Sequence, residues 1–281
     1  MKSKFSRRQL QTVLLVPLAI LVLGALAYEV LGPVALMLPI VLVGTFIAYL
    51  LVELRHFQLG LFHRQKEELI AQFTQMEALL GITWTLDPAL PLPGTRGWAA
   101  SPDLLRELVQ QVYMDPPQLV LEASSGTSTL VIAYAMERMG QGRVIALEHD
   151  AGYAEKTRRS IAAHGLTHRA SVIFAPLVVQ RIASSSYRWY DLKDLELPGT
   201  IDLLIVDGTP DTTQPMARYP AVPLLIDRFS KDARVILDDG ARPDERNTAE
   251  RWSTENRNCS KEYLPLEKGA WFLRFGGVPK A

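Results

Sequence analysis

Two long apolar stretches without a charged residue lie near the start of the chain, at residues 12–27 and 34–52. Crossing the roughly 30 Å hydrocarbon core of a bilayer takes about 20 helical residues at 1.5 Å each. The second stretch therefore predicts a transmembrane helix. The first is shorter and predicts a second transmembrane helix, so that residues 1–55 form a hairpin and the lipid bilayer is the partner of residues 12–52.

The distribution of Lys and Arg predicts the orientation of this hairpin. The connecting segment 28–33 has neither residue, whereas both flanks carry them: Lys2, Lys4, Arg7 and Arg8 before it, and Arg55, Arg64 and Lys66 after it. Positively charged flanks stay in the cytoplasm, so we expect the main domain to face the cytoplasm from the inner (cytoplasmic) membrane. A competing interpretation is a cleavable signal peptide over residues 1–27, because a basic start, an apolar core and Ala25-Leu-Ala27 also fit that pattern.

Residues 56–95 connect the membrane segment to the rest of the chain. Apolar residues at helical spacing predict a juxtamembrane helix: Ile70, Phe73, Met76, Leu79 and Leu80. In one interpretation this stripe packs on the following domain, and in another it forms a short coiled coil and so a homodimer. Three prolines and a glycine between residues 88 and 94 predict a stiff linker, which places the start of the next domain at residue 96.

From residue 96 to 281 short apolar runs alternate with amphipathic segments. Strands are expected near 118–122, 143–148, 171–175, 201–206 and 234–237, and helices near 128–139, 151–164, 219–229 and 244–254. A closing hairpin is expected from residues 262–266 and 270–275, and Ser101 and Asp150 are expected to cap helices. This alternation predicts an α/β fold, a mostly parallel sheet with helices on both faces.

The turn after the first of these strands carries the most specific signal. It runs Glu122-Ala-Ser-Ser-Gly126-Thr-Ser128, an acidic strand end followed by small residues whose free N–H groups open onto a ligand-binding crevice. The next strand ends in Glu148, whose carboxylate can accept both hydroxyls of a ribose. A nucleoside-containing cofactor is therefore predicted, with these contacts: Glu122, Ser124, Ser125, Gly126, Ser128 and Glu148.

The glycine content of this turn separates two candidate cofactors. A dinucleotide site takes three glycines in the pattern G-x-G-x-x-G, which lets the backbone approach a pyrophosphate. Only Gly126 is present here, and the carboxylate of Glu122 can answer a ligand ammonium directly or through water. The turn therefore favours S-adenosylmethionine over NAD.

Three further segments carry a resemblance to a known family: Ile201-Asp-Leu-Leu-Ile-Val-Asp207-Gly-Thr-Pro210, Ala217-Arg-Tyr-Pro-Ala221 and Val235-Ile-Leu-Asp238-Asp239. Together with the entry segment 96–103 they resemble class I S-adenosylmethionine-dependent methyltransferases of the bacterial "methyltransferase domain 24" type, over residues 96–275. The resemblance implies a Rossmann-like, doubly wound sheet of seven strands, methyl transfer to an oxygen or nitrogen, and a bacterial inner-membrane location. It also implies that Ala175 and Leu177 lie beside the adenine, and Ser124 stands where the family usually has glycine.

Carboxylates at the ends of two later strands suggest where the chemistry takes place. Asp207, Asp238 and Asp239 can together hold Mg²⁺ or another divalent cation through oxygen ligands. This trio is similar to that of catechol-type O-methyltransferases, although Pro210 stands where those enzymes have a lysine. Without a cation, Asp207 can act as the general base, and Asp239 is the second expected catalytic residue.

Arg218 and Tyr219 follow the fourth predicted strand and are candidates for binding an anionic or hydroxylated acceptor. An alternative for Arg218 is a structural ion pair with Asp207 or Asp211. The membrane segment suggests a lipid-linked acceptor, although a small molecule fits equally well. Two other functions stay open: a non-catalytic membrane adaptor that retains the fold, and an aminopropyl transferase or nucleotide-sugar enzyme on a related fold.

Composition limits the remaining function classes. Lys plus Arg and Asp plus Glu each total 30, so the formal net charge is zero and no electrostatic feature points to nucleic acid as a partner. The single cysteine, Cys259, excludes an intramolecular disulfide and is expected to be a bystander near a strand.

Overall fold

The computed structural model describes residues 7–276 and divides into two compact units, Met1–Ile70 and Ala71–Ala281. Lys2 and Lys4, which carry part of the predicted positive flank, lie outside the described residues. The predicted boundaries at residues 55 and 95 differ from this division, because one long helix continues across the first of them.

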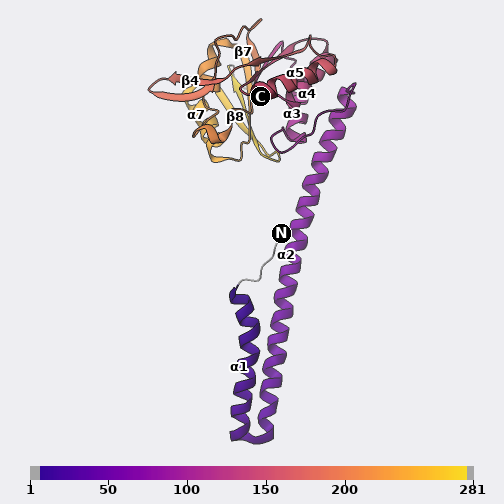
Figure 1. The fold of residues 1–281 in the computed structure, drawn as a ribbon, viewed down its shortest axis with the longest axis vertical. Coiled ribbons are helices and arrows are strands. Elements are labelled where there is room, and N and C mark those ends of the chain that lie inside the picture. The colour runs from indigo at the N-terminus through magenta and orange to yellow at the C-terminus, as the bar shows by residue number, and fades with distance from the viewer. Residues whose placement is uncertain (1–6, 277–281) are drawn as a thin grey trace. The chain divides into compact units, whose positions relative to one another are not determined.

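The first unit is a helical hairpin (Figure 1). Helix α1 (Arg7–Leu31) is followed by a short 3₁₀ helix (Gly32–Leu36) and by the first part of α2 (Met37–Leu86). The two helices approach closely at Gly24, where an added Cβ atom would lie 2.9 Å from Cγ of Pro39. Glycine at this position therefore permits the close packing of the hairpin.

Among the described residues, one helical stretch, Gly32–Leu86, is long and apolar enough to cross a bilayer. The apolar part of α1, Leu14–Val30, is shorter, and at 1.5 Å per residue it covers about 25 Å, less than a typical hydrocarbon core. The structure therefore does not support the prediction of two transmembrane helices.

The end of α2 belongs to the second unit. Ala78, Ile82 and Leu86 are buried, and the last two lie in the same apolar cluster as Leu104. Met76 and Leu80, from the stripe predicted to pack on the domain, are exposed instead. The helix thus packs through the face that contains Ala78 and not through the predicted face that contains Leu79. The second unit begins at Ala71, before the proline-rich linker.

A seven-stranded sheet forms the centre of the second unit (Figure 1). Its strands are β1 (Leu119–Ala123), β2 (Arg143–Glu148), β3 (Ala170–Phe174), β6 (Ile201–Val206), β7 (Phe229–Asp238), β8 (Cys259–Leu264) and β9 (Ala270–Phe275). Their order is β3-β2-β1-β6-β7-β9-β8; β9 is antiparallel to β7 and β8, and the other pairs are parallel. The predicted Rossmann-like α/β sheet is confirmed.

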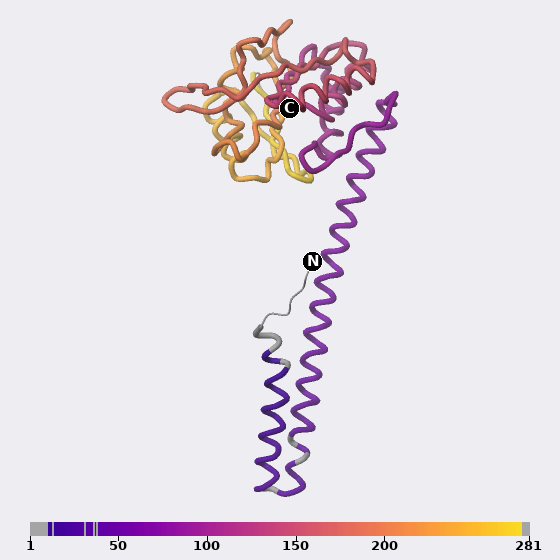
Figure 2. Tube along the Cα trace, viewed as in Figure 1, coloured from indigo at the N-terminus to yellow at the C-terminus, as the bar shows by residue number. Residues whose placement is uncertain are grey.

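Helices cover both faces of this sheet and bury one apolar cluster on each side. They are α3 (Pro102–Met114), α4 (Thr127–Met139), α5 (Ala151–Ala163), α6 (Ala221–Leu225) and α7 (Pro243–Glu255). The central strands β1 and β6 are apolar at nearly every position because both of their faces are covered. Figure 2 traces this unit from the end of α2 to the last strand.

Two predicted helix caps and one predicted helix differ in how well they agree with the structure. Asp150 caps α5 as predicted, accepting a hydrogen bond from the Tyr153 N–H at 2.8 Å. Ser101 occupies the N-cap position of α3, but its hydroxyl donates to Asp103 rather than accepting from the helix. The helix expected over 219–229 is broken into α6 and a 3₁₀ turn, Ile226–Arg228.

A two-stranded hairpin that was not predicted lies between β3 and β6. It consists of β4 (Leu177–Ile182) and β5 (Ser185–Tyr190), paired in antiparallel register. Its last two residues, Trp189 and Tyr190, are fully buried. The hairpin therefore places two large aromatic side chains under the carboxyl edge of the main sheet.

Candidate functional site

The predicted site residues gather at the carboxyl ends of β1, β2, β6 and β7. Backbone hydrogen bonds tie three of these ends together, because Ser124 N–H donates to Leu147 O at 3.0 Å and Gly208 N–H donates to Ala123 O at 2.7 Å. Ligands bind beyond this edge in open α/β sheets. The structure therefore brings the predicted carboxylates to one edge, as their positions after successive strands require.

The side chain of Glu122, predicted to contact a cofactor, is directed toward the first turn of α4. This side chain is fully buried and accepts hydrogen bonds from the hydroxyls of Ser128 and Thr129, the latter at 2.6 Å. Burial raises the pKa of Glu122 to about 8, against these two hydrogen bonds, with a further contribution from the Asp207 and Glu148 charges. Each oxygen of Glu122 thus accepts one hydrogen bond from the first turn of α4, and a contact with a ligand ammonium stays a prediction.

The same contact corrects the prediction for Ser128, whose hydroxyl points to Glu122 rather than to a cofactor. Thr129 was not predicted as part of this arrangement, yet its hydroxyl also accepts from Gly126 N–H at 3.0 Å and so holds the loop at the start of α4. Ser124 has φ of +133°, a backbone conformation that favours glycine. This conformation accounts physically for the glycine usual at this position.

Glu148 lies where the sequence predicts it, at the end of β2 beside the β1–α4 loop. Its Oε2 accepts from the N–H and hydroxyl of Ser125 at 3.2 and 3.0 Å, and its Oε1 accepts from Asp150 N–H at 3.1 Å. Nδ1 of His149 lies 3.1 Å from Oε1. Burial opposes ionisation, but the contacts with His149, Asp150 and Ser125 hold the pKa of Glu148 below its usual value. Glu148 is therefore ionised at neutral pH.

Ser125 gives this carboxylate a partner that can be exchanged. The Ser125 hydroxyl also lies 3.1 Å from Oγ1 of Thr157 on α5. A hydroxyl that turns to Thr157 frees one lone pair of Glu148 Oε2 for an incoming hydroxyl. The pair Ser125 and Glu148 is thus suited to binding a diol.

Ala175 is buried beside this group, and its N–H donates to the backbone oxygen of Glu148 at 2.7 Å. Leu177 begins β4 and packs against the cluster that contains Trp189 and Tyr190. Both residues therefore lie near Glu148 or the buried aromatic pair, and their position beside an adenine stays a prediction.

Tyr190 is a site residue that the sequence did not reveal. Its side chain is fully buried, its hydroxyl has no hydrogen-bond partner among the described residues, and a side chain at Gly208 would collide with that hydroxyl. Burial and the nearby charges of Glu148 and Asp207 raise its pKa well above the usual value, so the hydroxyl stays protonated. An unpartnered buried hydroxyl at this edge fits a polar ligand group that completes the site.

The second half of the site is a cluster of carboxylates around Arg218. Oxygen atoms of Asp207, Asp238 and Asp239 lie within 4.8 Å of one another. Arg218 lies inside this group, with Nη2 at 2.6 Å from Asp239 Oδ2 and at 3.5 Å from Asp207 Oδ1, and with Nη1 donating to the backbone oxygen of Asp238 at 2.8 Å. The close approach predicted for the three aspartates is observed, but with an internal cation among them.

The acceptor roles suggested for Arg218 and Tyr219 are not supported by their contacts. Arg218 is buried and its guanidinium is engaged by the carboxylate cluster, which bears out the alternative of an ion pair with Asp207; Asp211 pairs with Arg242 instead. Tyr219 donates from its hydroxyl to Glu255 on α7 at 2.8 Å. Neither side chain is therefore free to bind an acceptor.

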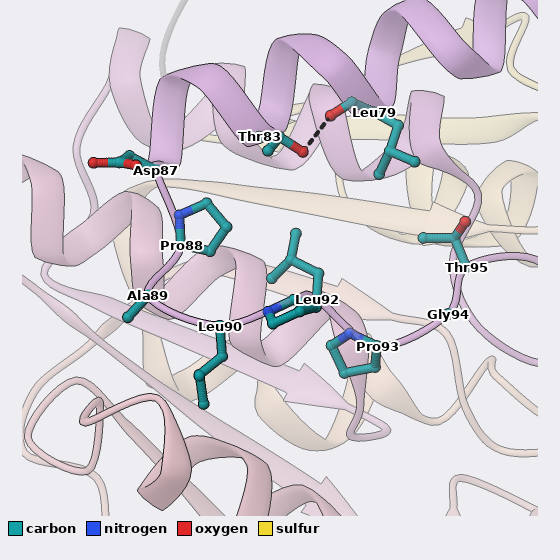
Figure 3. Close-up of a pocket in the computed structure, with 11 residues that line it drawn as sticks. Leu79, Thr83, Asp87, Pro88, Ala89, Leu90, Leu92, Pro93, Gly94 and Thr95 are labelled. Atoms are coloured by element: carbon teal, nitrogen blue, oxygen red, sulfur yellow. Dashed lines mark hydrogen bonds between the residues drawn. The ribbon is translucent and has the colours of Figure 1, made fainter.

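A groove of about 560 Å³ lies away from these carboxylates (Figure 3). The end of α2 and the proline-rich segment that follows it line the groove, from Leu79 to Thr95. Figure 3 shows mostly apolar side chains there, with Thr83 bonded back to Leu79 O. The groove contains none of the predicted site residues.

Comparisons with known proteins show what this chain is similar to. Residues 123–240, from the end of β1 to just after β7, match the family model of a methyltransferase domain. A ribosomal protein L11 methyltransferase of Pelobacter propionicus is 27% identical over 158 residues, which are 56% of this chain and 43% of that protein. The chain thus matches less than half the length of this curated relative.

A solved structure shows the same fold. The SAH-bound methyltransferase PaMTH1 of Podospora anserina superposes with a TM-score of 0.54 at 14% identity, over 76% of this chain and 96% of that one. At this level of identity the similarity concerns the fold, a Rossmann-like sheet. The family match, by contrast, covers the segment that contains the Glu148 and Asp207 sites.

Proposed function

We propose that this protein is a class I S-adenosylmethionine-dependent methyltransferase. The observation that carries the proposal is the ionised Glu148 at the end of β2, beside Ser125 of a loop with one glycine, within the segment that matches a methyltransferase domain. A buried carboxylate in this place is suited to the two ribose hydroxyls of a nucleoside cofactor. The buried hydroxyl of Tyr190 at the same edge, which has no partner within residues 7–276, also fits such a ligand.

The cofactor supplies an electrophilic methyl group, and the chain's residues align and deprotonate the acceptor. Because methyl transfer is an in-line displacement, the catalytic effect comes mostly from holding the two reactants in line. Asp207 is the general base of this proposal: its side chain is 16% exposed, whereas Asp239 is 6% exposed and paired with Arg218. Asp207 then takes the proton of an acceptor hydroxyl or amine as the new bond to carbon forms.

The protein acts at the membrane in this proposal. The stretch Gly32–Leu86 supports an anchor by its length and apolar composition, and α1 is proposed to complete a hairpin. The catalytic domain faces the cytoplasm of a bacterial cell, where the acceptor is a lipid-linked or small molecule. The exposed Phe73, Met76 and Leu80 follow coiled-coil spacing and favour a homodimer through α2.

Binding and turnover measured on the full-length protein in detergent test the proposed function. Glu148→Ala should weaken binding of S-adenosylmethionine or its demethylated product by ~1–3 kcal/mol, because ribose hydroxyls lose a charged acceptor. Asp207→Asn keeps the side-chain volume and should leave that affinity nearly intact. Its methyl transfer should fall by at least ~100-fold, the lower end of a typical acid–base contribution.

The pair of variants separates the rival functions. Calorimetry that detects no binding of either ligand to the unmodified protein would indicate an adaptor or an enzyme with another cofactor. Unchanged affinity in Glu148→Ala would remove the ribose assignment. Full turnover in Asp207→Asn would show that the acceptor is deprotonated elsewhere.

A further inference from the structure

The cluster around Arg218 has more partners than the three aspartates. Nε of Arg218 also lies 3.7 Å from Oε1 of Glu245 on α7, so three carboxylates and the backbone oxygen of Asp238 surround one guanidinium. Arg242 approaches Asp239 from the outside at 3.0 Å. Arg218 and the side chains of Asp239 and Glu245 are 4–6% exposed, whereas the side chain of Arg242 is 42% exposed. Arg218 is therefore the interior cation of this cluster.

The three aspartates have the composition and spacing of a divalent cation site. Carboxylate oxygens are the ligands that Mg²⁺, Mn²⁺ and Ca²⁺ prefer, and here the atoms lie within 4.8 Å of one another. Oδ2 of Asp238 is buried without a hydrogen-bond partner among the described residues. Burial and the charges of Asp207 and Asp239 raise the pKa of Asp238 well above its usual value.

The guanidinium contacts two of the three carboxylates that such an ion would need, and the backbone of the third aspartate. Its Nη2 lies between Asp239 and Asp207, and its Nη1 is bonded to the backbone of Asp238, so each of the three ligand residues already contacts Arg218. A divalent ion bound by the same oxygens would lie within a few ångströms of a permanent positive charge. That repulsion is strong in a buried site, because little water screens it.

Arg218 cannot easily leave or lose its charge. Its planar fork is held on three sides by Asp207, Asp239 and the Asp238 backbone, and an arginine stays protonated in proteins. Burial alone would lower the pKa of Arg218, but the charges of the surrounding carboxylates outweigh burial and raise this pKa above its usual value. The cluster thus contains a fixed positive charge that is part of the chain.

We propose that Arg218 is a built-in replacement for a divalent metal ion at the ends of β6 and β7. The guanidinium holds Asp207 and Asp239 in place, so Arg218 is a positioning residue, and the cluster binds no metal in the unmodified protein. The consequence for catalysis rests on the proposed function. If Asp207 is the general base of a methyltransferase, it contacts the acceptor directly, without a bridging metal ion. The acceptor then does not need two oxygens that chelate an ion.

The experiment measures Mn²⁺ binding by the loss of the free-ion electron paramagnetic resonance signal, on full-length protein without a polyhistidine tag. The unmodified protein should show no saturable site tighter than about 1 mM, the weak end of oxygen-ligand sites. Arg218→Gln should gain one Mn²⁺ site per chain, since removing the guanidinium leaves the carboxylates without their cation. The matched control, Arg242→Gln, removes the same charge from a side chain that also contacts Asp239 and should gain none.

A second variant identifies the ligands. Adding Asp238→Asn to Arg218→Gln should abolish the gained site. If Arg218→Gln unfolds without metal, addition of Mn²⁺ should restore the folded protein, which supports the inference equally. A stoichiometric Mn²⁺ site in the unmodified protein that Asp238→Asn removes would overturn the inference. A folded Arg218→Gln variant that binds no Mn²⁺ would also overturn it, as would an unfolded Arg218→Gln variant that Mn²⁺ does not restore. None of these outcomes depends on methyl transfer, so failure here is separate from failure of the proposed function.

Discussion

At the scale of single residues, the site separates carboxylates by their surroundings. Glu122 and Glu148 lie at the ends of neighbouring strands, yet burial raises the pKa of Glu122 to about 8 while hydrogen bonds lower that of Glu148. The difference comes first from burial, which is complete for Glu122 and outweighs its hydrogen bonds from two neutral hydroxyls. At Glu148 the contacts with His149, Asp150 N–H and Ser125 outweigh burial. Glu122 therefore holds the start of α4 to the end of β1. Glu148 is ionised and suited to binding a ligand hydroxyl.

The raised pKa of Glu122 predicts a pH-dependent stability. Folded Glu122 keeps its proton up to about pH 8, whereas in the unfolded chain it loses the proton near its ordinary pKa of 4.5. Unfolding between these values releases a proton, so the free energy of unfolding should fall as pH rises from about 4.5 to 8. Glu122→Gln, which keeps the shape and cannot ionise, should flatten this slope and be relatively more stable at pH 8.

Chemical denaturation of both proteins at pH 5, 6.5 and 8 in the same detergent provides the measurement. Asp238 titrates in both proteins, so the difference between the two slopes isolates Glu122. Parallel slopes would show that Glu122 ionises normally in the folded protein.

At the scale of elements, the β4–β5 hairpin determines what fills the space below the sheet edge. It follows β3 through Ala175-Pro176 and ends in Trp189 and Tyr190, whose rings meet edge to face at 5.2 Å. The ring of His149, next to Glu148, lies 6.1 Å from that of Tyr190. The last residues of the hairpin thus lie beside His149 at the end of β2 and are buried in the core.

Two tyrosines of similar burial provide a matched comparison. Tyr190→Phe should raise the free energy of unfolding by about 1 kcal/mol, because it removes a buried hydroxyl that has no partner among the described residues. Tyr219→Phe should lower it by about 1–2 kcal/mol, because the hydrogen bond to the Glu255 carboxylate is lost. If the Tyr190 hydroxyl serves the ligand, only Tyr190→Phe should also weaken cofactor binding.

Denaturation curves and calorimetry of the two variants test this contrast. A destabilised Tyr190→Phe with unchanged cofactor affinity would mean that its hydroxyl has an internal partner. A Tyr219→Phe as stable as the unmodified protein would mean that the Glu255 contact contributes nothing in solution.

At the scale of the whole molecule, the chain contains a helical hairpin unit and an α/β unit, and one helix, α2, contributes residues to both. Ala78 and Ile82, near the end of α2, lie in the interior of the second unit, and its earlier part is apolar and exposed. Residues 37–86 are therefore helical throughout, on both sides of the boundary between the units.

The proposed topology predicts where a reporter enzyme active only outside the cytoplasm gives a signal. Fused after Ala281 it should give none, and inserted near Glu29 it should give one, because the basic flanks remain inside. Intact-mass measurement of the purified protein distinguishes the signal-peptide alternative, since cleavage would leave a chain that begins at Tyr28. A signal from the fusion at Ala281 would place the catalytic domain outside the cytoplasm and contradict the proposal.

The sequence by itself determined the order of the seven strands of the main sheet along the chain and the edge at which the carboxylates meet, but not the β4–β5 hairpin. Both depend on local periodicity and on the rule that parallel strands end on one side, and so Glu148, Asp207 and Asp238 were predictable as neighbours. Only the tertiary structure decided the partners of each side chain. Thr129 reaches Glu122, Arg218 lies among the aspartates and Tyr190 enters from a separate hairpin, because these contacts depend on which way each side chain turns once the sheet and its helices have packed.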